Sequence, residues 1–275
     1  MPGADRGYDL SHDVHDFAAW TGKPRQSLVI CSHPRSGSTL LGEAIHFSGG
    51  LGCPLEYLHR GFRPYLAARW KAPDLASYVA AMHRWRTDPS GVFSIKLFWQ
   101  DIEEIAHERA PDRFPPPRSL SPDETNDALY RDYQALLADI LPEQTLVLLE
   151  RRDVIRQAVS GMIAAQTGLW RSIPGVGRRE AQAPPEYDYD RILGLVSFGR
   201  DSADHWRRYF RVLGTEPYRL AYEDLVRDYA GTAGALLTAL GRPGAPPPQR
   251  MQRQSDGVGE TMVLRFLRDH AARQG

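Results

Sequence analysis

The feature that most constrains the fold is a short apolar run followed at once by a small polar loop, within residues 28–41. The run Leu28–Cys31 lies between polar and basic residues and has the character of an interior strand of a parallel sheet. Gly37 then permits a tight turn, and Ser38 and Thr39 are residue types that open helices. A strand, loop and helix joined in this way direct backbone N–H groups and a helix N-terminus at one point. The stretch therefore predicts an anion site, for which phosphate or sulfate is the natural occupant.

The loop Pro34–Thr39 can be interpreted in three ways. A Walker A loop has a leading Gly and a Lys before its Ser or Thr, whereas here Ser38 follows Gly37 and the cation of the loop is Arg35. The run Pro-Arg-Ser-Gly-Ser-Thr is instead similar to the 5′-phosphosulfate loop, P-[KR]-[ST]-G-[ST]-T, of sulfotransferases that use 3′-phosphoadenylyl sulfate (PAPS). A strand–turn–helix corner that binds no ligand is the third interpretation.

Charge and composition exclude several function classes. The 275 residues carry 34 Lys and Arg against 34 Asp and Glu, so the whole-chain charge gives no reason to expect binding to nucleic acid or to a membrane. No apolar run approaches the ~18 residues of a membrane span, and because residues 1–21 lack the apolar core of a secretory signal, we expect none there. The two cysteines, Cys31 and Cys53, are too few for a disulfide framework. We therefore expect a cytoplasmic protein.

Strand patterns alternate with helix patterns along the rest of the chain, which predicts an α/β fold. Further strands are expected at 92–98, 145–150 and 218–221, and helices at about 39–47, 125–141, from 151 to 167, 191–213, 225–240 and 261–271. The segment 171–188, rich in Pro, Gly and Arg, is expected to be mobile or to cover a substrate. We expect residues 1–26 to form a loosely held N-terminal arm. Residues 27–275 should form a single-domain, P-loop-like three-layer fold, whose central, mostly parallel sheet is flanked by helices and binds its ligand at the strand C-termini.

A cluster of arginines follows the third predicted strand. In a nucleoside triphosphatase, Glu150 would be the acidic residue that serves Mg²⁺, but the guanidinium groups of Arg151, Arg152 and Arg156 fit a second phosphate better. Positive charge at the start of a helix is unfavourable because it opposes the helix dipole. A cluster of arginines at such a position therefore also indicates a site that binds an anion. Sulfotransferases hold the 3′-phosphate of PAPS with an Arg at such a strand end and a Ser in the next helix. Ser160 is the candidate Ser, and the sequence leaves open whether Arg151 or Arg152 is the Arg.

Four blocks together resemble the Stf0 family of sulfotransferases: the loop Pro34–Thr39, Pro54–Tyr57, Lys96–Trp99 and Arg151–Ser160. Shorter matches, at Gln166–Trp170 and Arg253–Asp256, extend the resemblance from about residue 27 to the C-terminus. It implies PAPS as donor, PAP as product, no metal, and a small-molecule hydroxyl acceptor that is a carbohydrate or another polyol-bearing compound. A homodimer is one assembly that such a chain could form.

The loop departs in one respect from the best-known member of the family. His33–Pro34 stands where the best-known member has a single polar residue before the Arg, so the acceptor side of the loop should differ in this chain.

The resemblance implies that Glu56 is the general base. Sulfuryl transfer to a hydroxyl requires a group that removes the hydroxyl proton. In cytosolic sulfotransferases a His two residues after the strand Lys does this, and here that position is Phe98. His33, His46 and His59 are rival candidates for the base, and His33 is the strongest of them because it lies in the loop.

The remaining candidate residues follow from the same resemblance. Lys96, at the end of the second predicted strand, would stabilise the charge that builds on the leaving phosphate. Tyr222–Leu225 resembles a segment common to sulfotransferases, and we expect it to be a structural connection from strand to helix. The candidate catalytic residues are Glu56, Arg35 and Lys96, and the candidate donor-binding residues are Arg35, Ser36, Gly37, Ser38, Thr39, Leu40, Arg151, Ser160, Arg253 and Gln254.

Two further functions stay open at this point. The first is a kinase with a degenerate P-loop, which would need Mg²⁺ and a nucleoside triphosphate. The second is a nucleotide-binding protein without catalytic activity.

Overall fold

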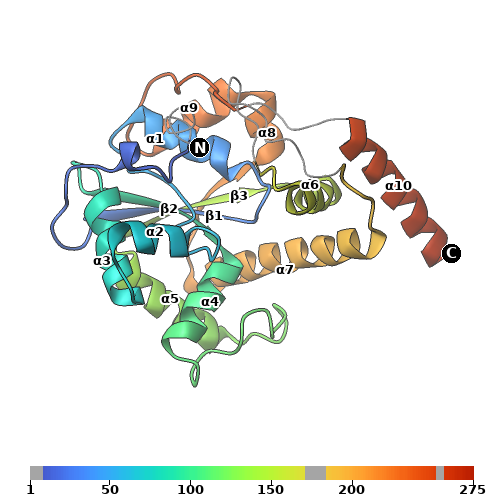
Figure 1. Ribbon diagram of the computed structural model, residues 1–275, viewed down its shortest axis with the longest axis horizontal. Helices are drawn as coiled ribbons and strands as arrows, with labels where there is room; N and C mark the ends of the chain where they lie inside the picture. Colours follow the sequence, from blue (N-terminus) through green and yellow to red (C-terminus); the bar gives the residue numbers. More distant parts are fainter. Residues whose placement is uncertain (1–8, 171–183, 252–256) are drawn as a thin grey trace.

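The structure, a computed structural model, describes residues 9–170, 184–251 and 257–275, and at its centre lies a parallel sheet (Figure 1). Its described strands run in the order β2-β1-β3-β4, and each neighbouring pair is parallel. They are β1 (Gln26–Ser32), β2 (Val92–Phe98), β3 (Gln144–Glu150) and β4 (Tyr218–Ala221). The expected α/β class, with a central parallel sheet flanked by helices, is confirmed.

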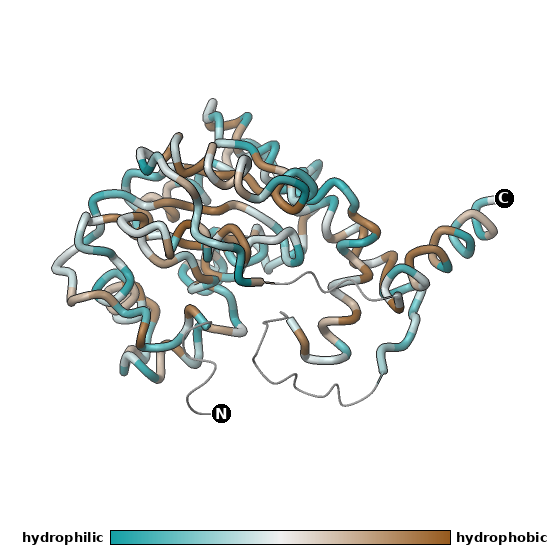
Figure 2. Tube along the Cα trace, turned by 90° about the horizontal axis from the view of Figure 1, so that it is seen from above, coloured by the Kyte–Doolittle hydropathy of each residue, from teal (hydrophilic) through white to brown (hydrophobic). Residues whose placement is uncertain are grey.

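Helices cover both faces of this sheet (Figure 1). One face carries α1 (Ser38–Ser48), α8 (Tyr222–Arg227) and α9 (Tyr229–Ala239). The other carries α2 (Arg63–Trp70), α3 (Leu75–Arg86), α4 (Trp99–Arg109), α5 (Asp127–Ile140) and the C-terminal half of α7 (Tyr189–Leu213). The N-terminal half of α7 packs with α6 (Val154–Thr167) and α10 (Gly257–Gln274) in a third hydrophobic cluster. Figure 2 shows α10 at one end of the molecule, away from the sheet. None of the described helices has the length and apolar character that a membrane crossing needs.

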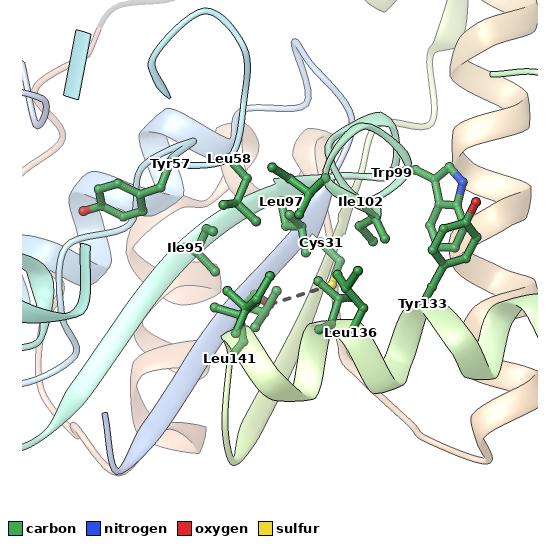
Figure 3. Packing of buried hydrophobic residues seen from close by; sticks show 14 of the residues in the cluster. Cys31, Tyr57, Leu58, Ile95, Leu97, Trp99, Ile102, Tyr133, Leu136 and Leu141 are labelled. Atoms are coloured by element: carbon green, nitrogen blue, oxygen red, sulfur yellow. Dashed lines mark hydrogen bonds between the residues drawn. The ribbon is translucent and has the colours of Figure 1, made fainter. Parts of the chain in front are cut away.

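Alternation along β2 sets the direction of its functional side chain. Ile95 and Leu97 belong to the same buried cluster as Ile102 of α4 and Leu136 of α5 (Figure 3). Successive side chains of a strand point to opposite faces of its sheet. Lys96 therefore projects to the other face, where α1 lies, and its side chain is only 3% exposed.

Most predicted elements are found with bounds shifted by a few residues, but one predicted helix is divided. The stretch expected as a helix over 225–240 consists of α8 and α9, which are separated at Asp228. The backbone of Asp228 is not helical, and its carboxylate caps α9 by accepting from the N–H of Gly231 at 2.9 Å. The helices α2, α3 and α4 were not anticipated from the sequence.

The described part of the N-terminal segment is anchored to the body of the fold by α3. Arg86 of α3 is fully buried and donates to the carbonyls of Leu10, at 2.6 Å, and His12, at 3.1 Å. It also pairs with Asp16 (Nε–Oδ1 2.9 Å) and donates to Sγ of Cys53 at 3.2 Å. Arg86 thus ties the N-terminal segment to the loop that carries the candidate base.

Arg86→Ala should lower the free energy of unfolding by about 3–5 kcal/mol, because breaking a buried ion pair leaves its partners without compensation. Urea denaturation followed by circular dichroism measures the change. Arg84→Ala, on an exposed position of the same helix, is the matched control and should change stability by no more than about 0.5 kcal/mol. Equal effects of the two substitutions would contradict the anchoring role.

Candidate active site

The loop between β1 and α1 has the tight backbone that its sequence predicts. Arg35 and Gly37 both adopt left-handed conformations, with φ of +68° and +83°. A Cβ on Gly37 would lie 2.6 Å from the ring of Tyr222, so only glycine fits this position. Ser36 is 1% exposed, and its hydroxyl finds no hydrogen-bond partner among the described residues. A buried hydroxyl of this kind indicates that the loop is shaped to bind a polar group.

Two guanidinium groups lie together at this loop. Arg35 belongs to the loop itself, and Arg151 reaches it from the end of β3. Nε of Arg35 donates to Oγ of Ser160 on α6 at 3.0 Å, and Nη1 of Arg35 donates to the carbonyl of Trp170. Arg151, directly after β3, donates to the carbonyl of Arg35 at 3.0 Å. Its guanidinium lies over the ring of Tyr222, 4.5 Å from the ring centre. The ends of β1, β3 and β4 therefore all contribute to one site.

The electrostatics of this site favour an anion. Burial and the like charge of Arg151 lower the pKa of Arg35 to about 10, so Arg35 is still cationic at neutral pH. The charges of Tyr222 and Glu56 act in the opposite direction on Arg35, which places the Glu56 carboxylate within electrostatic range of the loop. Two guanidinium groups held this close repel each other, and a bound phosphate or sulfate would relieve that repulsion.

Arg152, the other candidate for the second phosphate, is directed away from the loop. Its Nη1 donates to Oδ1 of Asp224 at 3.1 Å. Glu223 accepts from the backbone N–H groups of Arg152 and Asp153, both at 3.1 Å, and thereby fixes the chain after β3. The sequence left open whether Arg151 or Arg152 is the arginine that faces a second phosphate. Of the two, Arg151 is the one that lies beside the loop.

The candidate base and the candidate lysine form an ion pair on the other side of the loop. Nζ of Lys96 lies 3.0 Å from Oε1 of Glu56 and donates to Oγ1 of Thr39 at 3.2 Å. Leu55 forms a parallel bridge with Ile95, and its carbonyl accepts from the backbone N–H of Lys96 at 3.0 Å. This short pairing brings Glu56, which no predicted element carried, to the end of β2. The pair therefore adjoins the first turn of α1, where the phosphosulfate-type loop ends.

His33 is the candidate base that the sequence ranked next to Glu56. Its ring packs edge-on against Phe198 of α7, with ring centres 4.8 Å apart. Burial and the nearby charge of Arg118 lower the pKa of His33 to about 4. An imidazole with so low a pKa is neutral at pH 7 and is a weak proton acceptor.

Two further histidines and one glutamate were also candidates for proton or metal chemistry. His46 is near the far end of α1, and its ring nitrogen is 3.0 Å from that of His15. His59 lies near Glu56, and burial lowers its pKa. Glu150, the candidate acid of a triphosphatase, pairs with Arg207 of α7 (Oε1–Nη2 3.1 Å).

The remaining candidate residues are buried or fall outside the described part of the chain, and one contact residue was missed. Arg253 and Gln254 fall outside the described residues. Ser38 and Leu40 are buried in the first turn of α1. Tyr222 follows β4 directly, as the expected strand-to-helix connection, but it also contacts both Gly37 and Arg151. The signal for this second role was its place at the end of a parallel strand, where polar residues of neighbouring strands meet.

The imidazole of His33 should stay neutral from pH 8 down to about 5, as measured by NMR of the histidine ring protons and assigned with His33→Asn. Between pH 6.5 and about 4 the unfolded chain binds this proton and the folded chain does not, so His33 reduces stability as the pH falls through this range. A titration midpoint near 6.5 in the folded protein would show that the burial of this ring is not maintained.

Comparisons with known proteins agree with this geometry. The chain is 30% identical to a trehalose 2-sulfotransferase of Mycobacterium tuberculosis (strain ATCC 35801 / TMC 107 / Erdman), over 91% of this chain and 97% of that protein. It is also 30% identical to a trehalose 2-sulfotransferase of Mycolicibacterium smegmatis, over 92% of this chain and 97% of that protein. The model of the family described as Stf0 sulphotransferase matches residues 27–269. The chain therefore belongs to the Stf0 sulphotransferase family.

Proposed function

We propose that this protein transfers a sulfuryl group from PAPS to a hydroxyl of a carbohydrate or another polyol-bearing small molecule. The observation that carries the proposal is the Lys96–Glu56 ion pair, at 3.0 Å, beside Thr39 of a loop on which Arg35 and Arg151 converge. It unites a proton acceptor, a cation and an anion site. That the relatives are trehalose 2-sulfotransferases supports a sugar as the acceptor.

The loop residues fit the two phosphate groups of PAPS. The hydroxyl of Ser36, the first N–H groups of α1 and the guanidinium of Arg35 would hold the 5′-phosphosulfate. Arg151 and Ser160, which both contact Arg35, would hold the 3′-phosphate. A 3′-phosphate distinguishes PAPS and PAP from ATP and ADP, so the second subsite gives the donor selectivity.

The chemistry can be assigned to three side chains. PAPS, when bound, supplies the sulfuryl group, and its 5′-phosphate keeps the electron pair of the S–O bond that breaks. Glu56 takes the proton of the acceptor hydroxyl as the new O–S bond forms. Lys96 and Arg35 stabilise the negative charge that builds on the leaving phosphate. Because Lys96 contacts both Glu56 and Thr39, it links the proton acceptor to the loop that holds the donor.

The expected products follow from where the electron pair and the proton go in this reaction. The acceptor leaves as a sulfate ester, the proton stays on Glu56 until solvent removes it, and PAP leaves with the released charge. Fixed cations of the chain supply the charge stabilisation, so the proposal includes no metal. Cytoplasmic location and a homodimeric assembly stay predictions from the sequence.

PAP should bind at least about tenfold more tightly than ADP, because a charge-assisted contact to its 3′-phosphate contributes ~1.5–3 kcal/mol. Isothermal titration calorimetry without Mg²⁺ measures both affinities. Equal affinities, or binding that requires Mg²⁺, would favour a kinase. PAP binding without turnover of any acceptor in a mass-spectrometric screen with PAPS would favour a silent nucleotide-binding protein.

The same titration distinguishes the two neighbouring arginines. Arg151→Ala should remove the preference for PAP over ADP, whereas Arg152→Ala, its exposed and ion-paired neighbour, should retain it. Arg35→Ala should weaken PAP binding and also lower turnover, since its charge faces the leaving group. If Arg152→Ala abolishes the preference and Arg151→Ala does not, then Arg152 is the residue that binds the 3′-phosphate and our assignment is wrong.

Glu56→Gln should lower kcat by about 10²–10⁴-fold with PAP affinity nearly unchanged, because the amide keeps the shape of the side chain but accepts no proton. Turnover is measured by mass spectrometry with the best acceptor of the screen.

Glu104→Gln on α4 is the matched control, because Glu104 lies 4.0 Å from Arg60 and has no assigned part in the transfer. Its kcat should stay within a few-fold of the wild type, as expected for a surface substitution. If His33→Asn loses activity while Glu56→Gln stays largely active, His33 and not Glu56 is the general base.

A further inference from the structure

Arg118, in the connection between α4 and α5, is held in an unfavourable backbone conformation by a buried carboxylate. Its φ is +62°, in the left-handed region that a non-glycine residue rarely adopts. Its backbone N–H donates at 3.0 Å to Oε2 of Glu103, a residue that is 6% exposed. The second oxygen of Glu103 accepts from Nε1 of Trp99 at 3.0 Å. Positive φ at a non-glycine residue also occurs at Arg35 of the loop, at Lys71 and at Glu143, so it is the hydrogen bond to buried Glu103 that fixes the position of Arg118.

Arg118 is exposed, and its side chain packs on an aromatic ring without an ion-pair partner among the described residues. Its guanidinium carbon lies 4.0 Å from the ring centre of Phe198, at the distance of a stacked pair. Among the described residues, no carboxylate oxygen lies within 4.0 Å of this guanidinium and none accepts a hydrogen bond from it. Asp201 is near enough for the charge of Arg118 to act on it, yet it forms no ion pair with this guanidinium, and burial raises the pKa of Asp201. Arg113, an exposed arginine of the same connection, is by contrast paired with Asp132 at 2.5 Å.

Arg118 also lies beside the loop that holds the donor in the proposed function. The ring of Phe198, on which Arg118 stacks, contacts the ring of His33. His33 immediately precedes Pro34 and Arg35, and the charge of Arg118 contributes to the low pKa of His33. The resemblance described above leads us to expect that this part of the loop, at His33–Pro34, differs from the best-known member of the family. Arg118 and this departure therefore occupy the same region of the molecule.

We propose that Arg118 is an anion receptor on the acceptor side of the site, so that the acceptor carries a carboxylate or phosphate in addition to the hydroxyl that is sulfated. The inference rests on the proposed function and specifies its substrate class. A guanidinium that stacks on a ring by its face leaves the N–H groups of its edge free to bind a carboxylate or phosphate through two parallel hydrogen bonds. The neutral ring of His33 adds no second charge, so Arg118 alone would select for the anionic group.

Binding of matched neutral and anionic sugars to the PAP-loaded protein tests the proposal. The probes are trehalose with trehalose 6-phosphate, and glucose with glucuronate, each titrated by calorimetry. In the wild type, the anionic member of at least one pair should bind roughly tenfold more tightly or better, and the pair that shows it distinguishes phosphate from carboxylate. Arg118→Gln should abolish this preference. Equal affinities in both pairs, no binding of any probe, or a preference that survives Arg118→Gln would each overturn the proposal.

The controls separate this inference from the function on which it rests. Arg113→Gln, which removes a paired arginine from the same connection, should retain the preference for the anionic sugar. PAP affinity is measured in every variant, since a wild type that does not bind PAP refutes the proposed function itself. PAP binding with no preference between the sugars refutes only the role of Arg118. If Arg118→Gln does not fold, Arg118→Lys replaces it, and an unchanged preference there would contradict a role for the planar, stacked guanidinium.

Discussion

Parallel pairing of β1 with β2 and β3 is the constraint on which the site depends. In the observed register Ser32, the last residue of β1, stands opposite Phe98 of β2 and Leu149 of β3, so these strands end at almost the same level. Each strand end then delivers its own group to one edge of the sheet: the anion-binding loop from β1, Lys96 from β2 and Arg151 from β3. Because the pairing is parallel, these groups meet although they lie far apart in the sequence.

The site brings three cationic side chains together with the carboxylate of Glu56. Arg35 belongs to the loop, Arg151 donates to its backbone, and Lys96 pairs with Glu56 beside it. Such an arrangement is suited to an anionic ligand, and it places the Glu56 carboxylate beside Lys96, on the other side of the loop from Arg151. Glu223 supports the arrangement indirectly, since it binds the backbone after β3 and leaves Arg151 directed at the loop. A segment that looks like a simple connection in the sequence thus holds part of the site in place.

The two flanks of the loop are built differently. Lys96 and Arg151 come from strand ends, and Thr39 comes from the first turn of α1, which the sheet fixes. On the other flank, His33, Phe198 and Arg118 come from the loop, from α7 and from an irregular connection, and a buried carboxylate on α4 holds that connection. Irregular connections can change without disturbing the sheet, so a family can keep one donor site while its acceptors diverge.

The anion loop, the strands and the α/β class could be predicted from the sequence, because they depend on local residue types: an apolar run, a glycine with positive φ, and helix-opening hydroxyls. The residues also pointed to Lys96 and to the arginine cluster, yet they left the choice between Arg151 and Arg152 open, and Glu56 was named only from the family resemblance. The positions of these side chains depend on tertiary contacts, namely the ion pair that turns Arg152 outward and the bridge between Leu55 and Ile95 that carries Glu56 to the end of β2. The stacking of Arg118 on Phe198 likewise had no signal in the sequence. Local propensity fixes the shape of a loop, whereas the direction of a charged side chain depends on partners that only the packed sheet and helices bring near.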